Sequence, residues 1–114
     1  MNKEKPWTNI VENLSTVETE VYLDKYPVTE GHLLFVPTRA TEKGIIFALR
    51  LALETGNDIL AEGKCDGFNI GLNMGKAAGQ TVGWPHVHLI PRHEGDIEDP
   101  TGGVRGVIPE KQKY

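Results

Sequence analysis

The sequence predicts an α+β domain in which an antiparallel sheet is covered by one main helix. Short apolar segments typical of strands lie before and after a single long segment with helical periodicity. Strands that follow one another through short turns pair in antiparallel fashion. The 114 residues, 39% hydrophobic and 25% charged, have the size and composition of one ordinary globular domain. We therefore expect residues 1–114 to form a single domain.

The first pair of strands is predicted over residues 20–36. Residues 27–31 contain proline and glycine, which favour a turn between the two strands. Residues 32–36 form a continuous apolar run that ends at Pro37, and such a run is typical of a strand buried on both faces. Residues 1–13 are mostly polar and are broken by Pro6, so we expect either a loose entry, placed over residues 1–9, or an edge segment.

The helix is predicted over residues 42–62. Thr41 is the expected N-cap, and Gly63 is expected to end the helix in the left-handed conformation. Gly56 lowers the helix propensity, and we expect it to permit close packing on the sheet. Apolar residues recur at intervals of three and four and predict one stripe facing the core: Ile45, Leu49, Ala52, Leu53, Ile59 and Leu60.

A second pair of strands is predicted after the helix. Residues 67–73 alternate between apolar residues and small or polar ones, as in a strand with one buried face. Residues 85–90 are expected to form the last strand, which Pro91 stops. Residues 93–114 are rich in glycine, proline and charge, and we expect an extended surface tail.

The composition of the chain argues against several classes of partner and indicates a cellular compartment. Sixteen acidic and twelve basic residues give a net charge of −4, which argues against a broad nucleic-acid-binding surface. The single cysteine, Cys65, excludes an internal disulfide. No apolar run is long enough for a bilayer and none resembles a signal peptide, so we expect a cytosolic protein with no membrane partner.

Two histidines stand at alternate positions of the last predicted strand. On a strand, His86 and His88 project from the same face, with their roots about 7 Å apart, while Val87 and Leu89 point into the core. A neutral imidazole serves as a nucleophile, a base or a metal ligand. Taken alone, the pair also fits surface decoration or half of a metal site. No further ligands follow at zinc-site spacing, so a metal site is disfavoured.

The loop over residues 73–81 leads directly into these histidines. Its two glycines allow backbone N–H groups to turn towards an anion, and Gln80 and Thr81 add side-chain donors. The alternative is a plain connecting loop. Asp24 and His32, taken alone, are read as a solvated charge at a strand end and a satisfied core histidine.

The order of several short motifs along the chain is more specific than any one of them. Residues 78–82, Ala-Gly-Gln-Thr-Val, precede residues 86–92, His-Val-His-Leu-Ile-Pro-Arg. Together with residues 22–28, 31–32 and 67–71, they resemble the histidine triad superfamily of nucleotide hydrolases and transferases over about residues 10–110. Residues 102–109 resemble the bacterial-type members often called diadenosine polyphosphate hydrolases.

The chain departs from the family's motif at one position. The family carries three histidines at alternate positions, and alignment without gaps places Trp84 at the first of them. His86 then matches the middle histidine, which is the family's nucleophile, and His88 matches the last. A second register makes His86 the first histidine and His88 the nucleophile, with Ile90 at the third position. That register needs an insertion and a deletion, and it is disfavoured.

The resemblance implies a mechanism. His86 attacks the α-phosphorus of a nucleotide while its other ring nitrogen is held by a backbone carbonyl of the motif, and water then releases the mononucleotide. His88 donates to the phosphoryl oxygens. The resemblance also implies substrate-site positions at Asp24 (for the ribose hydroxyls), His32 (beside the last histidine), Asn73, Gln80, Thr81 and Trp84 (as an apolar wall).

The resemblance implies hydrolysis of a phosphoanhydride or phosphoramidate at a nucleoside monophosphate. A dinucleoside polyphosphate of adenosine or another purine is the first expectation, and a nucleoside phosphoramidate is the second. The alternative is a purine-nucleotide-binding or sensing module with little turnover, which the replacement at Trp84 favours. We expect no cofactor, no metal and no nucleic-acid partner, and the resemblance implies a two-fold homodimer.

Overall fold

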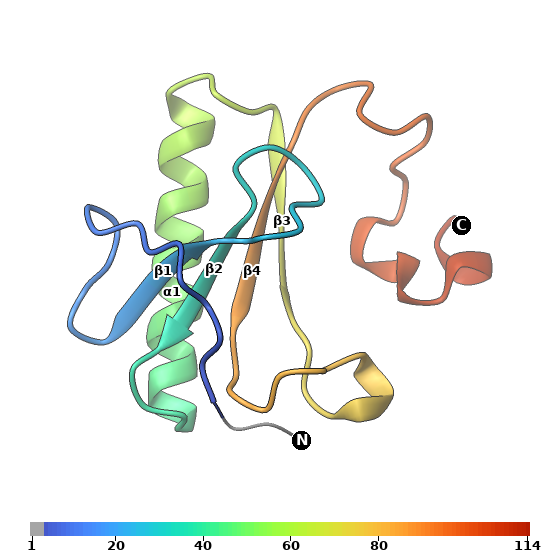
Figure 1. The fold of residues 1–114 in the computed structure, drawn as a ribbon. Coiled ribbons are helices and arrows are strands. Elements are labelled where there is room, and N and C mark those ends of the chain that lie inside the picture. Colours follow the sequence, from blue (N-terminus) through green and yellow to red (C-terminus); the bar gives the residue numbers. More distant parts are fainter. Residues whose placement is uncertain (1–3) are drawn as a thin grey trace.

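The computed structural model describes residues 4–114 as one four-stranded sheet with a long helix on one side (Figure 1). All strand pairs are antiparallel, in the order β1-β2-β4-β3. The α+β prediction is therefore confirmed. The elements are β1 (Thr19–Leu23), β2 (Leu33–Pro37), α1 (Glu42–Ala61), β3 (Gly67–Leu72), the short turn η1 (Lys76–Ala78), β4 (Val87–Arg92), and the turns η2 (Gly103–Val107) and η3 (Pro109–Lys111).

Strands β1 and β2 form the predicted hairpin, and β2 is buried along its whole length. On one face of the sheet, Phe35 and its neighbours pack against α1. On the other face, Leu34 and Val36 join Tyr22 in a second buried cluster, against which two tryptophans pack. The continuous apolar run is thus explained by packing on both sides of the strand.

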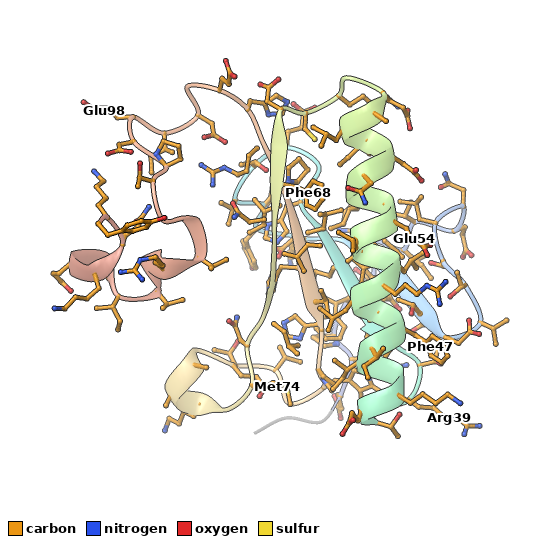
Figure 2. The ribbon with its side chains drawn as sticks, turned by 180° about the vertical axis from the view of Figure 1, so that it is seen from behind. Arg39, Phe47, Glu54, Phe68, Met74 and Glu98 are labelled. Carbon is orange, nitrogen blue, oxygen red and sulfur yellow. The ribbon has the colours of Figure 1, made fainter. Side chains whose placement is uncertain are left out.

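The ends of α1 follow the sequence prediction. The hydroxyl of Thr41 accepts a hydrogen bond from the backbone N–H of Gly44 at 3.1 Å, and Gly63 adopts a φ of +71° just beyond the helix. The expected close approach at Gly56 is also present, because a Cβ there would lie 2.8 Å from the ring of Phe68 on β3. Figure 2 shows Phe68 on the side of the sheet that α1 covers.

The predicted stripe of α1 is only partly correct. Leu49, Leu53 and Leu60 are 36%, 50% and 39% exposed. Small side chains face the sheet instead, because they let the helix axis approach it closely, and the larger leucines are displaced to one side. The residues of α1 that are buried are Gly44, Ala48, Ala52, Thr55 and Gly56.

Within residues 4–114, no helix combines the length and apolar content needed to cross a membrane.

The prediction that Pro91 stops the last strand is wrong. Strand β4 begins after His86 and continues through Pro91, which pairs with Phe68 of β3. Pairing with β2 ends at Leu89, so no ladder hydrogen bond is required from Pro91 on that side. The Pro91 carbonyl, which faces the same side, accepts a hydrogen bond from the hydroxyl of Thr29 at 2.6 Å.

The described part of the N-terminal segment is held against the sheet. Residues 5–11 are called here the N-terminal arm, and residues 9–11 of the arm lie along β1. The Asn9 carbonyl accepts a hydrogen bond from the backbone of β1 at 2.9 Å, and Ile10 forms an isolated bridge to the same strand. Residues 1–3, the remainder of the segment predicted to be loose over 1–9, lie outside the described residues.

The C-terminal segment over residues 93–114 is not extended as predicted. It winds through η2 and η3 beside β3 (Figure 1). None of the residues of these two turns is buried, and Val104 and Val107 are 63% and 81% exposed. Together with β3 and β4, the segment borders an open, mostly apolar groove of about 840 Å³.

Candidate active site

A cleft of about 530 Å³ lies on the face of the sheet opposite α1. Val87 and Leu89 of β4 are fully buried against the helix, so alternation along the strand turns His88 to the other face. The N-terminal arm, the end of β1, and the segment between β3 and β4 complete the walls. The cleft brings together six of the eight predicted site residues: Asp24, Asn73, Gln80, Thr81, His86 and His88.

A hydrogen bond to the backbone orients the ring of His86. Its Nδ1 lies 2.9 Å from the carbonyl oxygen of Trp84. A carbonyl can only accept, so Nδ1 carries the hydrogen and Nε2 of the neutral ring keeps its lone pair. The backbone carbonyl that the resemblance implies for this role is thus in place.

A chain of hydrogen bonds makes His88 a hydrogen-bond donor, whereas His86 is an acceptor. The backbone N–H of Val28 donates to Nδ1 of His32 at 3.0 Å, so the hydrogen of the neutral His32 ring is on Nε2. His32 Nε2 lies 2.9 Å from Nδ1 of His88 and donates to it. The hydrogen of His88 is therefore on Nε2, which is left to donate to a ligand. His32 is buried behind the cleft and does not line it.

Burial keeps these two rings neutral. The pKa of His88 is lowered to about 4, chiefly by burial and further by the neighbouring rings of His86 and His32. Burial also lowers the pKa of His32, against the opposing effect of the Asp24 carboxylate, whose Oδ2 lies 3.5 Å from His32 Nε2. The other oxygen of Asp24 accepts a hydrogen bond from the backbone N–H of Tyr26 at 2.8 Å. At neutral pH the cleft thus contains a neutral donor at His88.

We expect the free energy of unfolding to fall as the pH is lowered from about 6.5 towards about 4. In this window the unfolded chain binds a proton at His88 and the folded chain does not, so acid favours unfolding. Each such histidine contributes a slope of up to about 1.4 kcal/mol per pH unit. Urea denaturation at pH 7 and pH 5 measures it. The His88→Asn variant should show a shallower dependence than the parent, and equal slopes would contradict the burial argument.

Gln80 does not offer a donor to the cleft, although it borders it. Its Oε1 accepts from the backbone N–H of Gly75 at 2.8 Å, and its Nε2 donates to the carbonyls of Val82 and Gly83 at 2.9 and 3.3 Å. Both hydrogens of the amide are therefore used inside the loop, and Gln80 fixes the shape of the loop. Thr81, which is exposed at the cleft, remains available to a ligand.

Trp84 does not form the predicted wall of the pocket. Its Nε1 donates to the carbonyl of Pro37 at the end of β2, at 2.8 Å, and its ring packs on the cluster of Tyr22, Leu34 and Val36. The indole is drawn there because the cluster buries its apolar ring while the carbonyl satisfies its N–H. Trp84 is not among the residues that line the cleft.

The sequence prediction missed Trp7, which does line the cleft. The centroid of its ring lies 4.8 Å from that of His86. The sequence contained one indication of this role. A tryptophan stands in a short polar segment, which offers its large apolar ring no neighbouring side chains to pack against. Nothing local in the segment predicts that its tryptophan reaches the cleft.

One group of side chains has the spacing of a metal site, but its hydrogen bonds do not fit one. Ligand atoms of Asp24, His32 and His88 lie within 4.8 Å of one another. A histidine ligand needs a lone pair on its coordinating nitrogen and a hydrogen on the other. The Val28 N–H bond to Nδ1 imposes the reverse arrangement on His32, with the hydrogen on Nε2. His32 is therefore hydrogen-bonded to His88 through the nitrogen that a metal would need, and Asp24 lies beside this pair.

Comparison with known proteins gives matches in sequence and in structure. A family model described as HIT domain matches residues 3–95. An uncharacterized HIT-like protein of Methanocaldococcus jannaschii is 36% identical over 87 residues, which cover 68% of this chain and 64% of that protein. An AP-4-A phosphorylase of Mycobacterium tuberculosis is 34% identical over 98 residues, covering 77% of this chain and 50% of that protein.

A solved structure matches over a similar span. A zinc-bound histidine triad family protein from Mycobacterium smegmatis is 29% identical, with a TM-score of 0.68, covering 75% of this chain and 67% of that chain. The chain thus spans 50% to 67% of the length of these three relatives.

Proposed function

The chain belongs to the HIT domain family, and on this premise we propose that it is a nucleotide hydrolase or transferase acting at the α-phosphate of a nucleoside monophosphate derivative. The proposed substrate is a dinucleoside polyphosphate, for which the likeness to an AP-4-A phosphorylase is support. The observation that carries the proposal is the pairing of an acceptor nitrogen on His86 with a donor nitrogen on His88, on rings whose centroids are 5.2 Å apart.

The proposed reaction has two displacements at phosphorus. The lone pair of His86 Nε2 forms a bond to the α-phosphorus, and the bond to the leaving phosphate or amine breaks with its electron pair. Water then attacks the phosphorus, the P–N bond breaks and its electron pair returns to Nε2. The proton released by the water balances the one that the leaving group takes up. Dividing one displacement into two lowers each barrier.

Charge that develops on the phosphoryl oxygens requires donors already in place. The Nε2–H of His88 is one, because the His32 bond fixes its tautomer. The side chains of Asn73 and Thr81 border the same cleft and are proposed as further donors. Asp24 also borders it, and its carboxylate is proposed to accept the ribose hydroxyls.

The hydrogen bonds favour the register in which Trp84 occupies the position of the first triad histidine. In the other register His88 is the nucleophile, but its Nδ1 accepts from His32 and its Nε2 carries the hydrogen. The neutral His88 ring therefore has no free lone pair for the cleft. His86 has one, so we assign the nucleophile to His86.

The test is to incubate the protein separately with diadenosine tetraphosphate and with an adenosine phosphoramidate and to measure release of AMP. AMP from the first substrate supports the proposal, and AMP from the second alone assigns the phosphoramidate activity instead. A ligand-induced rise in the melting temperature without AMP would show the alternative, a nucleotide-binding module. The tryptophan at position 84, where the resemblance puts the first histidine of the motif, supports this alternative.

We also propose that two copies associate through β3 and the adjoining side of α1. Within residues 4–114 no strand pairs with the outer edge of β3, whereas β1 at the other edge is covered by the N-terminal arm. Leu49, Leu53 and Leu60 lie within about 60° of Gly56 around the helix axis, and Gly56 packs on β3. The exposed leucines therefore flank the open edge. A second copy placed there would cover both, together with part of the groove beside β3.

The Leu53→Lys variant is expected to shift this association towards monomer, because it places a charge in the centre of the apolar stripe. Size-exclusion chromatography with light scattering measures the mass. Glu54→Lys is the matched control, since Glu54 is exposed and lies on another side of the helix. A parent protein that remains monomeric at all concentrations, or a Leu53→Lys protein that remains dimeric, would rule out this interface.

A further inference from the structure

The two histidines of the cleft are held in place by different parts of the protein. Pairing of β4 with both of its neighbours begins at Val87, so His88 lies within the sheet. His86 precedes the strand, and the hydrogen bond that orients its ring joins Nδ1 to the carbonyl oxygen of Trp84 at 2.9 Å. The orientation of the proposed nucleophile therefore depends on where the backbone of residue 84 lies.

The side chain of Trp84 anchors this part of the backbone to the sheet. Its Nε1 donates to the carbonyl of Pro37 at 2.8 Å. Pro37 is the last residue of β2, is fully buried and pairs with Thr19 of β1, so the acceptor belongs to a well-packed part of the fold. The indole ring is half-buried against the second buried cluster of the sheet. Residue 84 is thus tied to the end of β2 through its own side chain.

Further contacts hold the indole and the chain on either side of it. The Lys5 ammonium lies 4.8 Å from the centre of the ring, within the range of a favourable cation–π contact. In the chain, the carbonyl of Gly83 accepts from Gln80 at 3.3 Å, and Pro85, whose φ is fixed by its ring, is buried. The acceptor for His86 is therefore in position before any ligand arrives.

We propose that Trp84 is a positioning residue for the nucleophile, because its anchored indole holds the carbonyl that keeps the hydrogen of His86 on Nδ1 and the lone pair on Nε2. The proposal rests on the proposed function of the cleft and adds a residue that acts through His86. Trp84 does not line the cleft, so loosening the anchor leaves the substrate contacts intact and misplaces the attacking nitrogen. The effect of Trp84 is therefore on kcat rather than on KM.

The kinetic test compares Trp84→Phe and Trp84→Ala with the parent on diadenosine tetraphosphate. Trp84→Phe keeps a ring in the cluster but loses the bond to Pro37, and kcat should fall about 10-fold. Trp84→Ala loses the ring as well, and kcat should fall about 100-fold, the scale on which a displacement of about 1 Å acts. KM should stay within a few-fold of the parent in both. A parental kcat in both variants would overturn the proposal.

The matched control for a loss of stability is Val21→Ala. Val21 is fully buried on the face of the sheet that α1 covers, so the loss of its methyl groups destabilises the fold without touching the anchor. Urea denaturation measures the free energy of unfolding of each variant, and Val21→Ala should keep the parental kcat. If Val21→Ala lowers kcat as much as a Trp84 variant of equal stability, Trp84 only stabilises the fold and the proposal fails.

An NMR measurement separates this proposal from the proposed chemistry. In protein with ¹⁵N-labelled histidine at pH 8.5, where an ordinary imidazole is neutral, the ring shifts report which nitrogen carries the hydrogen. The His86 signals, identified by their loss in His86→Ala, should show the hydrogen on Nδ1 in the parent. The other tautomer should appear in Trp84→Phe and increase in Trp84→Ala. The tautomer of His88 should stay unchanged, because His32 fixes that ring.

The two measurements can fail separately. A change of the His86 tautomer in a protein that releases no AMP supports the role of Trp84 and refutes the hydrolase. An unchanged His86 tautomer in both Trp84 variants overturns the role of Trp84, whether or not the parent releases AMP. A change at His88 as large as that at His86 also overturns it, since the substitution then disturbs the whole site.

Discussion

Replacing His86 with alanine is expected to lower kcat for diadenosine tetraphosphate by about 10⁴-fold or more, the scale on which an enzyme responds to the loss of its nucleophile. The variant has no lone pair aimed into the cleft, because the neutral His88 ring accepts from His32 at Nδ1 and carries its hydrogen on Nε2. Apart from His86 and His88, no histidine of the described residues borders the cleft. Release of AMP under saturating substrate is the measurement.

The matched control is His93→Ala. His93 is exposed, lies outside the cleft and bonds through Nε2 to the carbonyl of Lys64 at 3.1 Å, so its loss should leave the rate of AMP release unchanged. Mass spectrometry after rapid quenching should also detect one nucleoside monophosphate bound covalently to the peptide that contains His86. A His86→Ala protein with parental activity, or an adduct on a different side chain, would remove His86 as the nucleophile.

Replacing His88 with alanine is expected to lower kcat by about 10²- to 10³-fold, as for the loss of one donor to a transition-state oxygen. The effect is smaller than at His86 because the bond-forming atom remains. It falls mainly on kcat, since the donor is needed most when charge develops on the phosphoryl oxygens. Steady-state kinetics with diadenosine tetraphosphate separate kcat from KM.

Partial rescue distinguishes donation from packing. The His88→Asn variant keeps a side-chain N–H, so it should recover part of the activity that His88→Ala loses. Urea denaturation of both variants shows whether stability accounts for the difference. If kcat follows stability alone, or if alanine and asparagine are equally impaired, His88 holds the structure and is not a donor to the substrate.

The strands and the helix ends could be predicted because the signals for them are local. The apolar run that became β2 and the cap at Thr41 depend on residues within a few positions of one another. The face on which His88 lies follows from strand alternation in the same way, whereas His86 precedes β4. These features therefore needed no knowledge of the tertiary structure.

The features that escaped prediction depend on distant partners. Trp7 meets His86 only because the N-terminal arm pairs with β1. Pro91 is tolerated in β4 only because β2 has already ended beside it. Periodicity could not tell which apolar residues of α1 face the sheet, because the close approach at Gly56 favours small side chains over leucines.

The contact of Lys5 with Trp84 has a consequence for any attempt to place a histidine at position 84, where the resemblance puts the first histidine of the motif. Substituting histidine at position 84 deletes the ring beneath the Lys5 ammonium and the indole bond to the carbonyl of Pro37. A more orthodox motif would then come with a less firmly attached arm and a less well-placed Trp7. The position of the Trp7 ring beside His86 is thus coupled to a side chain that lies outside the cleft, and any redesign of position 84 has to include the N-terminal arm.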